Sequence, residues 1–354
     1  MRIIEKTFEK NLDESQLAVI DSATLLFDIE STGLSSKYCY VYAIGCAYYK
    51  AGILHFIQYF GEGPADESLI IEEFIRLSSG FGKYISFNGQ NFDIRFLTDR
   101  ANALSLQCNI SAIKHLDLYR MIMPYKKLLG FSSLRQKYLE EFICSGRKDD
   151  TNGGELTCVY KEFLENSDAN LLKILMQHNE EDVLGLVELC KLYSYISLFD
   201  DSTEKEGNLA EITDKECIYS IMLTHPLPKS INILANSLYL HAERKNAYLK
   251  IPVYKGKLKF FFDDYKNYWY YPEEDRAIHS SLAVYGEKSH RIKATAKTAY
   301  ITKTSSFLPS YGYGDELFYD EYKGKAYIEL SDKIKTPGNY LTGYLNHLIS
   351  SFKG

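Results

Sequence analysis

The sequence predicts an α/β fold in the first half of the chain, with a mixed sheet flanked by helices, followed by a β-rich domain. Strand-like and helix-like segments alternate up to about residue 195, residues 199–210 are polar and charged, and aromatic, alternating segments follow. The chain of 354 residues, 45% of them hydrophobic, is long enough to bury two cores. We expect one domain at residues 1–198, a linker at 199–210 and a second domain at 211–354.

The first half should build its sheet around residues 24–30, a nearly continuous apolar run that is typical of a buried central strand. Residues 38–50 and 53–60 are rich in β-branched and aromatic residues and flank Ala51-Gly52, which predicts a hairpin. Short strands are expected at residues 83–87 and 115–119. Apolar residues at helical spacing predict helices at residues 68–77, 92–104, 116–123, 132–142, 159–164 and 171–195.

The second half should consist of β segments, which we expect at residues 248–254, 258–262, 268–271, 294–302 and 325–330. Basic and aromatic residues interleave at residues 255–271, around the single tryptophan, Trp269. Aromatic rings beside cations are typical of surfaces that bind single-stranded nucleic acid. A β-sheet core with lysines along its edge has the same composition, so the sequence leaves both interpretations open.

Charge is distributed unevenly along the chain. Residues 1–204 hold 20 Lys and Arg against 30 Asp and Glu, a net charge of −10. Residues 205–354 hold 21 against 17, a net charge of +4. An acidic half joined to a mildly basic half is compatible with a metal-loaded catalytic domain beside a surface that meets a polyanion.

The cysteines and the N-terminus indicate the cellular compartment. The seven cysteines form no CxxC pair, which disfavours a disulfide framework or a zinc knuckle and favours reduced thiols. The N-terminus lacks an apolar core followed by a cleavage site, and no apolar run approaches the roughly 20 residues that span a bilayer. We therefore expect a soluble, cytoplasmic protein without a membrane partner.

Three acidic motifs carry most of the functional information. Asp28 and Glu30 end the apolar run at residues 24–30, Asp93 follows the strand expected at 83–87, and His178 precedes Asp182 by four residues in a predicted helix. Alternate residues of a strand share one face, as do residues four apart in a helix. Because an unpaired carboxylate beside a buried segment is costly, a bound cation would stabilise such a cluster. Taken singly, the motifs could also be exposed acids at a strand end, a helix cap and a surface pair on a helix.

In order and spacing, Asp-x-Glu, Asn-x3-Phe-Asp and His-x3-Asp resemble the three motifs of the DEDD (DnaQ-like) 3′–5′ exonuclease superfamily. Within it the chain is most similar to RNase H-like domains of the YprB type, over roughly residues 20–195. The resemblance implies an RNase H-like fold and two-metal hydrolysis of phosphodiester bonds in DNA or RNA. Asp28, Glu30, Asp93 and Asp182 would hold two Mg²⁺ or Mn²⁺ ions, since hard oxygen ligands suit these ions better than zinc.

His178 departs from the pattern of that superfamily. There a histidine generally lies five positions before the last aspartate, whereas the residue four positions before it is usually a tyrosine. His178 stands at the tyrosine spacing from Asp182. Because histidine titrates near neutral pH, we expect His178 to be the general base that deprotonates the attacking water.

Other residues are candidates for contacts to the substrate. By the same resemblance, Thr32 and Gly33 would bring backbone amides to the terminal nucleotide, and Leu34 would pack beneath its base. Asn88 could orient Asp93 or contact the scissile phosphate. Basic residues that could contact the phosphate backbone, or simply be surface charges, are Lys126, Lys127, Arg135, Arg147 and Lys148.

The leading hypothesis is therefore a metal-dependent nuclease, most consistent with a 3′–5′ exonuclease acting on single strands, with a second domain that helps to hold the substrate. The alternative is a nucleic-acid-binding module with the same fold and little or no catalysis. Glycoside hydrolysis also uses two carboxylates, but the order of the motifs disfavours it.

Overall fold

The computed structural model describes residues 1–144, 146, 153–203, 205–283 and 290–353, which divide into two compact units. Unit 1 comprises residues 1–197 and 225–229, and unit 2 comprises residues 198–224 and 230–354. The boundary lies within helix α8 (Tyr193–Phe199). Strand β7 (Gly207–Ile212) begins inside the stretch expected as a linker. Polar side chains are compatible with a strand here because β7 lies at the edge of its sheet.

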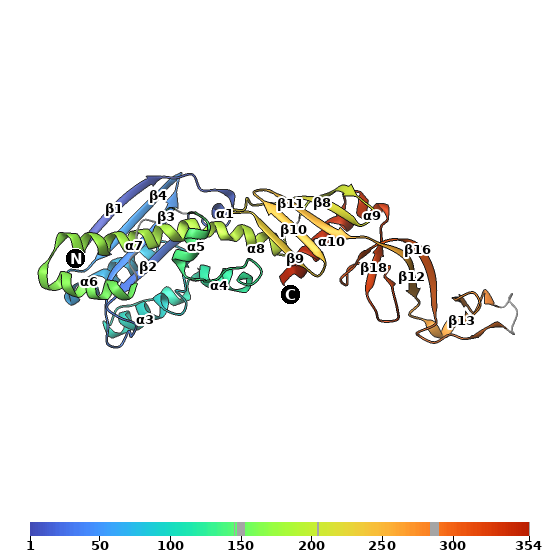
Figure 1. Ribbon diagram of the computed structural model, residues 1–354. Helices are drawn as coiled ribbons and strands as arrows, with labels where there is room; N and C mark the ends of the chain where they lie inside the picture. Colours follow the sequence, from blue (N-terminus) through green and yellow to red (C-terminus); the bar gives the residue numbers. More distant parts are fainter. Residues whose placement is uncertain (145, 147–152, 204, 284–289, 354) are drawn as a thin grey trace. The chain divides into compact units, whose positions relative to one another are not determined.

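Unit 1 is built on a six-stranded mixed sheet with the strand order β1–β4–β3–β2–β5–β6 (Figure 1). The pairs β1–β4, β4–β3 and β3–β2 are antiparallel, whereas β2–β5 and β5–β6 are parallel. The strands are β1 (Arg2–Glu9), β2 (Thr24–Ser31), β3 (Val41–Lys50), β4 (Ile53–Phe60), β5 (Lys83–Ser86) and β6 (Lys114–Asp117). This sheet confirms the predicted fold class. Strand β1 was not expected, because it is an exposed edge strand with several charged side chains.

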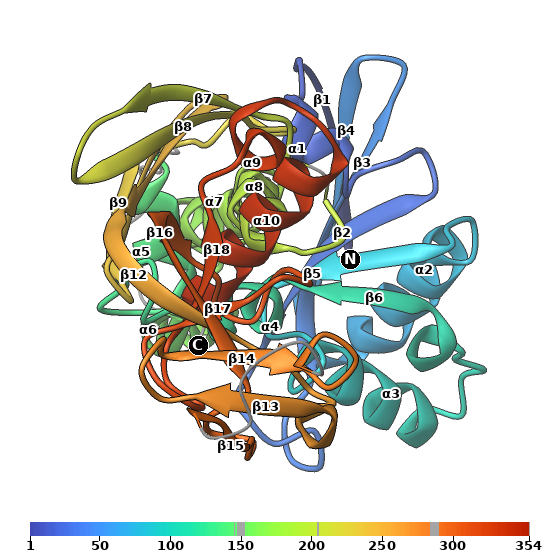
Figure 2. The same cartoon turned by 90° about the vertical axis from the view of Figure 1, so that its right-hand side faces the viewer.

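Helices cover both faces of this sheet. In Figure 2, α2 (Glu67–Ser78) and α3 (Asp93–Ala103) lie on one side of it and α7 (Ala169–Leu189) on the other. The other helices of unit 1 are α1 (Glu14–Leu17), α4 (Leu118–Ile122), α5 (Gln136–Phe142) and α6 (Gly153–Asn166). No helix in the described part of the chain has both the length and the apolar character needed to cross a membrane.

Three predicted helices differ from the observed ones by more than two residues in their limits. Helix α6 spans Gly153–Asn166, where residues 159–164 were expected. The helix expected at residues 171–195 is interrupted: α7 ends at Leu189, a 3-10 turn spans Cys190–Leu192, and α8 follows. The helix expected at residues 132–142 begins only at Gln136. Ser133 explains the late start, because its hydroxyl accepts a hydrogen bond from the backbone N–H of Arg135 (3.1 Å) and so competes with helical pairing.

The packing of α7 on the sheet determines where the acidic motifs lie. Alternate residues of β2 face opposite sides, and Phe27 and its neighbours pack with α2 and α3 in the main core. Asp28 pairs with Gly45 of β3. A Cβ at Gly45 would lie 2.4 Å from Oδ1 of Asn179 and 2.8 Å from Cγ2 of Val183, both on α7. Only glycine therefore allows α7 to lie this close to the strand pair that carries Asp28.

Unit 2 is rich in antiparallel strands. Its sheets have the orders β7–β8–β11–β10–β9, a closed barrel of β12–β16–β18–β17, and β14–β13–β15. The strands after β7 are β8 (Glu216–Met222), β9 (Ile231–Ala235), β10 (Leu238–Glu243), β11 (Asn246–Pro252), β12 (Tyr254–Phe261), β13 (Tyr268–Tyr271), β14 (Arg276–His279), β15 (Ile292–Lys293), β16 (Tyr300–Pro309), β17 (Phe318–Tyr319) and β18 (Ala326–Glu329). Helices α9 (Asp332–Lys335) and α10 (Asn339–Ser350) follow them. The predicted β-rich second half is confirmed.

The strand expected at residues 294–302 differs in position, since β16 starts only at Tyr300. A turn precedes it, in which the carbonyl of Thr295 accepts hydrogen bonds from the N–H groups of Thr298 (3.0 Å) and Ala299 (2.9 Å). The hydroxyl of Thr298 accepts a further bond from the N–H of Thr295 (2.9 Å). Threonine side chains thus stabilise a turn where β propensity alone favours a strand.

Replacing Gly45 by alanine should lower the free energy of unfolding by about 1–3 kcal/mol, because the new Cβ would push α7 away from β3. Urea-induced unfolding followed by circular dichroism measures this change. Gly63→Ala is the matched control, since a Cβ there meets no atom within 4 Å and the backbone is extended with φ at 172°. Equal stability of the two variants would contradict the packing argument.

Candidate metal centre

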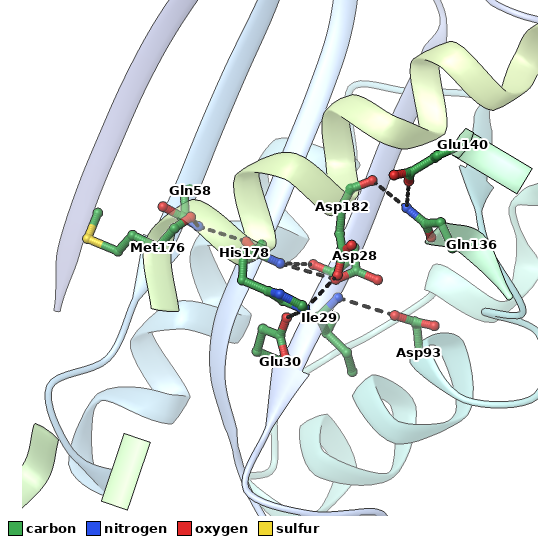
Figure 3. A network of polar contacts seen from close by, with 11 residues as sticks. Asp28, Ile29, Glu30, Gln58, Asp93, Gln136, Glu140, Met176, His178 and Asp182 are labelled. Atoms are coloured by element: carbon green, nitrogen blue, oxygen red, sulfur yellow. Dashed lines mark hydrogen bonds and ion pairs between the residues drawn. The ribbon is translucent and has the colours of Figure 1, made fainter. Parts of the chain in front are cut away.

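Strand β2 and helices α3 and α7 bring the predicted metal ligands together. Asp28 and Glu30 lie near the end of β2, Asp93 is the first residue of α3, and Asp182 projects from α7 beside His178 (Figure 3). The negative charges of Asp182, Asp93 and Glu30 all act on Asp28. The four carboxylates therefore occupy one site, although they come from three separate elements.

Asp28 is the carboxylate that the other three surround. Burial raises its pKa well above the ordinary value, and the charges of Asp182, Asp93 and Glu30 raise the pKa further. A hydrogen bond from Nδ2 of Asn179 to Oδ2 of Asp28 (3.2 Å) acts in the opposite direction. A positive charge placed among these acids would stabilise the ionised form of Asp28.

Asp93 links helix α3 to strand β2. Its Oδ1 accepts a hydrogen bond from the backbone N–H of Ile29 (3.2 Å). The N-cap residue of α3 is Phe92, so Asp93 does not have the capping position that the sequence left open. Burial raises the pKa of Asp93 to about 7, and the charges of Asp117 and Asp182 also raise it.

His178 is buried between two of the acids, with 4% of its surface exposed. Its Nε2 lies 3.0 Å from Oδ2 of Asp182 and 3.7 Å from Oε1 of Glu30. The pair formed by His178 and Asp182 is therefore part of the acidic cluster and not an ordinary surface pair. The imidazole stands directly beside two predicted metal ligands.

The donor set suits a divalent cation. Within the described ranges of the chain, Glu30, His178 and Asp182 offer ligand atoms that all lie within 4.8 Å of one another. Asp28 and Asp93 add two buried carboxylates, whose pKa values are raised by burial and, to a lesser extent, by neighbouring negative charges, so that a cation would favour their ionised forms. Oxygen atoms predominate among the donors, as hard divalent cations require.

Asn179 is a residue of this site that the sequence analysis missed. It is fully buried, and its Nδ2 donates to both Oδ2 (3.2 Å) and the backbone oxygen (3.3 Å) of Asp28. Its own Oδ1 accepts a hydrogen bond from Nε2 of Gln58 (2.9 Å), which also donates to the carbonyl of Met176 (3.0 Å). The sequence did contain a signal for this residue, because Asn179 is a polar side chain that directly follows His178 in an otherwise amphipathic helix.

A second support reaches α7 from helix α5. Nε2 of Gln136 donates to the backbone oxygen of Asp182 (2.8 Å) and to Oε1 of Glu140 (2.8 Å). Gly185 makes this contact sterically feasible, since a Cβ there would lie 2.0 Å from Oε1 of Glu140. The turn of α7 that carries Asp182 is thus held by α5 as well.

Asp117, at the end of β6, fixes the loop that leads to Asp93. Its Oδ1 accepts a hydrogen bond from the N–H of Asn88 (2.8 Å), and its Oδ2 accepts one from the N–H of Gln90 (3.2 Å). Asn88 has a φ of +59°, and its side-chain oxygen accepts a hydrogen bond from Asn91 (2.7 Å). The role of Asp117 is therefore to position this loop.

A cleft of about 630 Å³ opens onto the acidic cluster. Asp28 and Asp93 line it, and so do the basic residues Lys126 and Arg135. Its other lining residues are Ile29, Phe87, Asn88, Phe92, Tyr119, Ser132, Ser133, Leu134 and Gln136. Of the remaining basic candidates, Lys127 is not among the lining residues, and Arg147 and Lys148 lie outside the described residues.

The segment after β2 carries the other predicted substrate contacts, and these residues do not line the cleft. The N–H of Thr32 donates to the carbonyl of Tyr40 (3.0 Å), so a nucleotide would have to share or replace this bond. The carbonyl of Gly33 accepts a hydrogen bond from the hydroxyl of Ser31 (2.8 Å). Leu34 is 89% exposed, which leaves its apolar side chain available to a ligand.

One comparison with known sequences agrees with the predicted fold. A sequence profile of the RNase H superfamily matches residues 25–194, which include the three acidic motifs. Among solved structures, the family B DNA polymerase from the hyperthermophilic archaeon Pyrobaculum calidifontis is similar over 93% of this chain and 41% of the polymerase, at 13% sequence identity and a TM-score of 0.39. This chain thus spans less than half the length of that polymerase. No curated protein matches the sequence.

Without divalent cations, the protein should become less stable as the pH rises from about 4 to about 8. In the folded protein the pKa of Asp93 is about 7 and that of Asp28 is also raised, whereas their ordinary value is 3.8. Between these values the unfolded chain loses protons that the folded protein retains, so the free energy of unfolding falls with pH. Thermal unfolding in EDTA across this range measures the effect.

Asp93→Asn should flatten this dependence, because one of the two titrating acids is removed. A saturating divalent cation should raise the unfolding temperature more at pH 8 than at pH 5, where protons compete for the carboxylates. An unfolding temperature in EDTA that does not change with pH would argue against buried, mutually repelling acids.

Proposed function

We propose that this protein is a metal-dependent nuclease that hydrolyses phosphodiester bonds of DNA or RNA, and the match of residues 25–194 to the RNase H superfamily supports the proposal. The observation that carries the proposal is the convergence of Asp28, Glu30, Asp93 and Asp182 on one buried site. Within the superfamily we assign the domain to the DEDD exonucleases of the YprB type. We further propose 3′–5′ exonuclease activity on single strands, and a cytoplasmic location.

Two Mg²⁺ or Mn²⁺ ions would occupy the site, held by the four carboxylates. When bound, they would supply Lewis-acid stabilisation of the charge that develops on the phosphate and the leaving oxygen. The protein's own part is to keep the carboxylates ionised and aligned. Asn179 does so for Asp28 (3.2 Å), and the backbone N–H of Ile29 does so for Asp93 (3.2 Å).

The cleft beside the carboxylates would receive the end of the strand. Lys126 and Arg135 would bind phosphate oxygens on the wall of the cleft, since guanidinium and ammonium groups are the usual partners of phosphate. Phe87 and Tyr119, whose ring centroids lie 5.8 Å apart, would contact a base or sugar. This combination of basic and aromatic lining residues suits an unpaired nucleotide.

Terminal recognition would fall to the segment after β2. The exposed Leu34 would pack beneath the terminal base, with backbone amides of Thr32 and Gly33 near the last nucleotide. Asn88, which lines the cleft, would contact the scissile phosphate. Unit 2 would help to hold the rest of the strand.

His178 would act as general base through Nε2, the ring nitrogen that faces Glu30 and Asp182. In this role it takes a proton from the water that attacks the phosphate.

The combined substitution Asp28→Asn and Glu30→Gln should reduce cleavage of a labelled single-stranded oligonucleotide by about 1000-fold or more, because ligands of both ions are lost. The assay follows release of mononucleotides with Mg²⁺ or Mn²⁺. Glu162→Gln, on the exposed face of α6, is the control and should retain full activity. If the wild-type protein binds the oligonucleotide without releasing nucleotides, the protein is instead a binding module without catalysis.

The pH dependence of the cleavage rate should lose its rise on the acidic side in His178→Phe, because the titrating base is gone. Rates of the wild-type and variant proteins are compared from about pH 5 to about 9 under saturating metal. A His178→Phe protein with an unchanged pH profile would exclude the base role. His178→Gln serves as a second variant that keeps a polar side chain near Asp182.

A further inference from the structure

We propose that one face of strands β12 and β16 in unit 2 binds single-stranded nucleic acid. We name it the lysine face, after Lys255, Lys257 and Lys259 of β12. It is a second binding surface, separate in residues from the cleft that holds the acids. That the bound polymer is a nucleic acid rests on the proposed function, whereas binding to this face does not require catalysis.

The register of β12 puts the three lysines on one side of the sheet. They alternate along the strand, and their cross-strand partners in β16 are the hydroxyl residues Ser306, Thr304 and Thr302. On the opposite side Leu258 is buried with Phe307 and Phe318 in the core of the barrel. Lys255 and Lys257 are exposed and Lys259 is half-buried. The structure thus separates the lysines from the core, which the sequence alone left undecided.

The spacing of the lysines matches that of a nucleic-acid backbone. Alternate residues of a strand lie about 6.7 Å apart, which is close to the separation of successive phosphates in an extended single strand. The row of serine and threonine hydroxyls beside the lysines offers further donors to phosphate oxygens.

Aromatic rings continue the same face beyond the lysines. Phe261 follows Lys259 on this side and pairs with Tyr300. Its ring centroid lies 5.3 Å from that of Tyr300, 5.9 Å from that of Tyr319 and 5.4 Å from that of Tyr322. Phe261, Tyr319 and Tyr322 are half-buried, so part of each ring can contact a base.

The lysines have two acidic neighbours, of which Asp214 is exposed and Asp275 is half-buried. Lys255 forms an ion pair with Asp214, and Lys257 lies 3.5 Å from Asp275. Lys259 lies 4.4 Å from the ring centroid of Tyr300. Exposed ion pairs contribute little and are screened by salt, so a phosphate can replace Asp214. Asp275 is held in place by hydrogen bonds from the hydroxyls of Tyr270 and Tyr300, and a phosphate would bind Lys257 beside it.

Fluorescence anisotropy with a labelled single-stranded 12-mer tests the proposal in the full-length protein. The measurement uses the Asp28→Asn, Glu30→Gln background in EDTA, so that no strand is cleaved. Combined Lys255→Gln, Lys257→Gln and Lys259→Gln should weaken binding at least tenfold. The slope of log Kd against log salt should fall by about 2, because roughly 0.7 counterions are released per phosphate contact in single strands.

The matched control replaces by glutamine three lysines of unit 2 that are not on the lysine face, namely Lys245, Lys333 and Lys303, which pairs with the buried Leu258 on the other side of the sheet. It removes the same charge and should keep most of the affinity and the salt slope. Thr304→Glu is a second test that adds one negative charge to the lysine face and leaves every lysine in place. It should also weaken binding, and the unfolding temperature of each variant checks that it is folded.

Two results would overturn the proposal. The first is a triple lysine variant that binds the 12-mer with the wild-type affinity and salt slope. The second is displacement of the 12-mer by polyglutamate at equal charge concentration, because this face would then bind acidic polypeptides in general. If the nuclease proposal fails, the result is different: the unsubstituted protein, supplied with metal, binds the strand but releases no products.

Discussion

The contact between helix α7 and strands β2 and β3 is the constraint on which the rest of unit 1 depends. Gly45 lets the helix lie so close that the side chain of Asn179 reaches Asp28. One helical turn further along, Asp182 then meets Glu30 and His178. A helix displaced by the width of one methyl group would separate these groups, and the cluster would lose the mutual proximity that makes it a ligand set.

Gathering like charges in this way opposes folding. Burial raises the pKa values of Asp28 and Asp93, and the negative charges of the neighbouring acids raise them further. The apolar core around Phe27 and the helices α2 and α3 must outweigh that repulsion. Acids that destabilise the fold in which they lie indicate a selected function, since neutral residues at these positions would be better tolerated.

Much of the fold and of the acidic cluster could be predicted from the sequence, because strong local patterns carry them. The apolar run before Asp28 identified the central strand, and the spacing of His178 and Asp182 identified one face of α7. The hydrogen bonds that hold Asp28 could not be predicted, because Asn179 and Gln58 are 121 positions apart and neither has a distinctive local context. Only the tertiary structure brings such residues together.

Unit 2 was harder to predict for a related reason. Strand β8 was not expected, although its buried residues Cys217, Tyr219 and Ile221 alternate along it, because short strands with few core residues resemble loops. The helix α10 escaped prediction in a segment otherwise rich in strands, although Leu341, Tyr344 and Leu345 mark its buried face. Side-chain direction along β12 likewise needed the observed register.

The wide separation of the ligands along the chain also governs when the site can form during synthesis. The bond between Asn179 and Asp28 spans 151 positions. A nascent chain exposes Asp28, Glu30 and Asp93 long before α7 leaves the ribosome, and domains complete their non-local contacts only after the last element emerges. A translation product truncated ahead of α7 would lack Asp182 and the hydrogen bond from Asn179 to Asp28. The fold thus delays assembly of the acidic cluster until the whole of unit 1 exists.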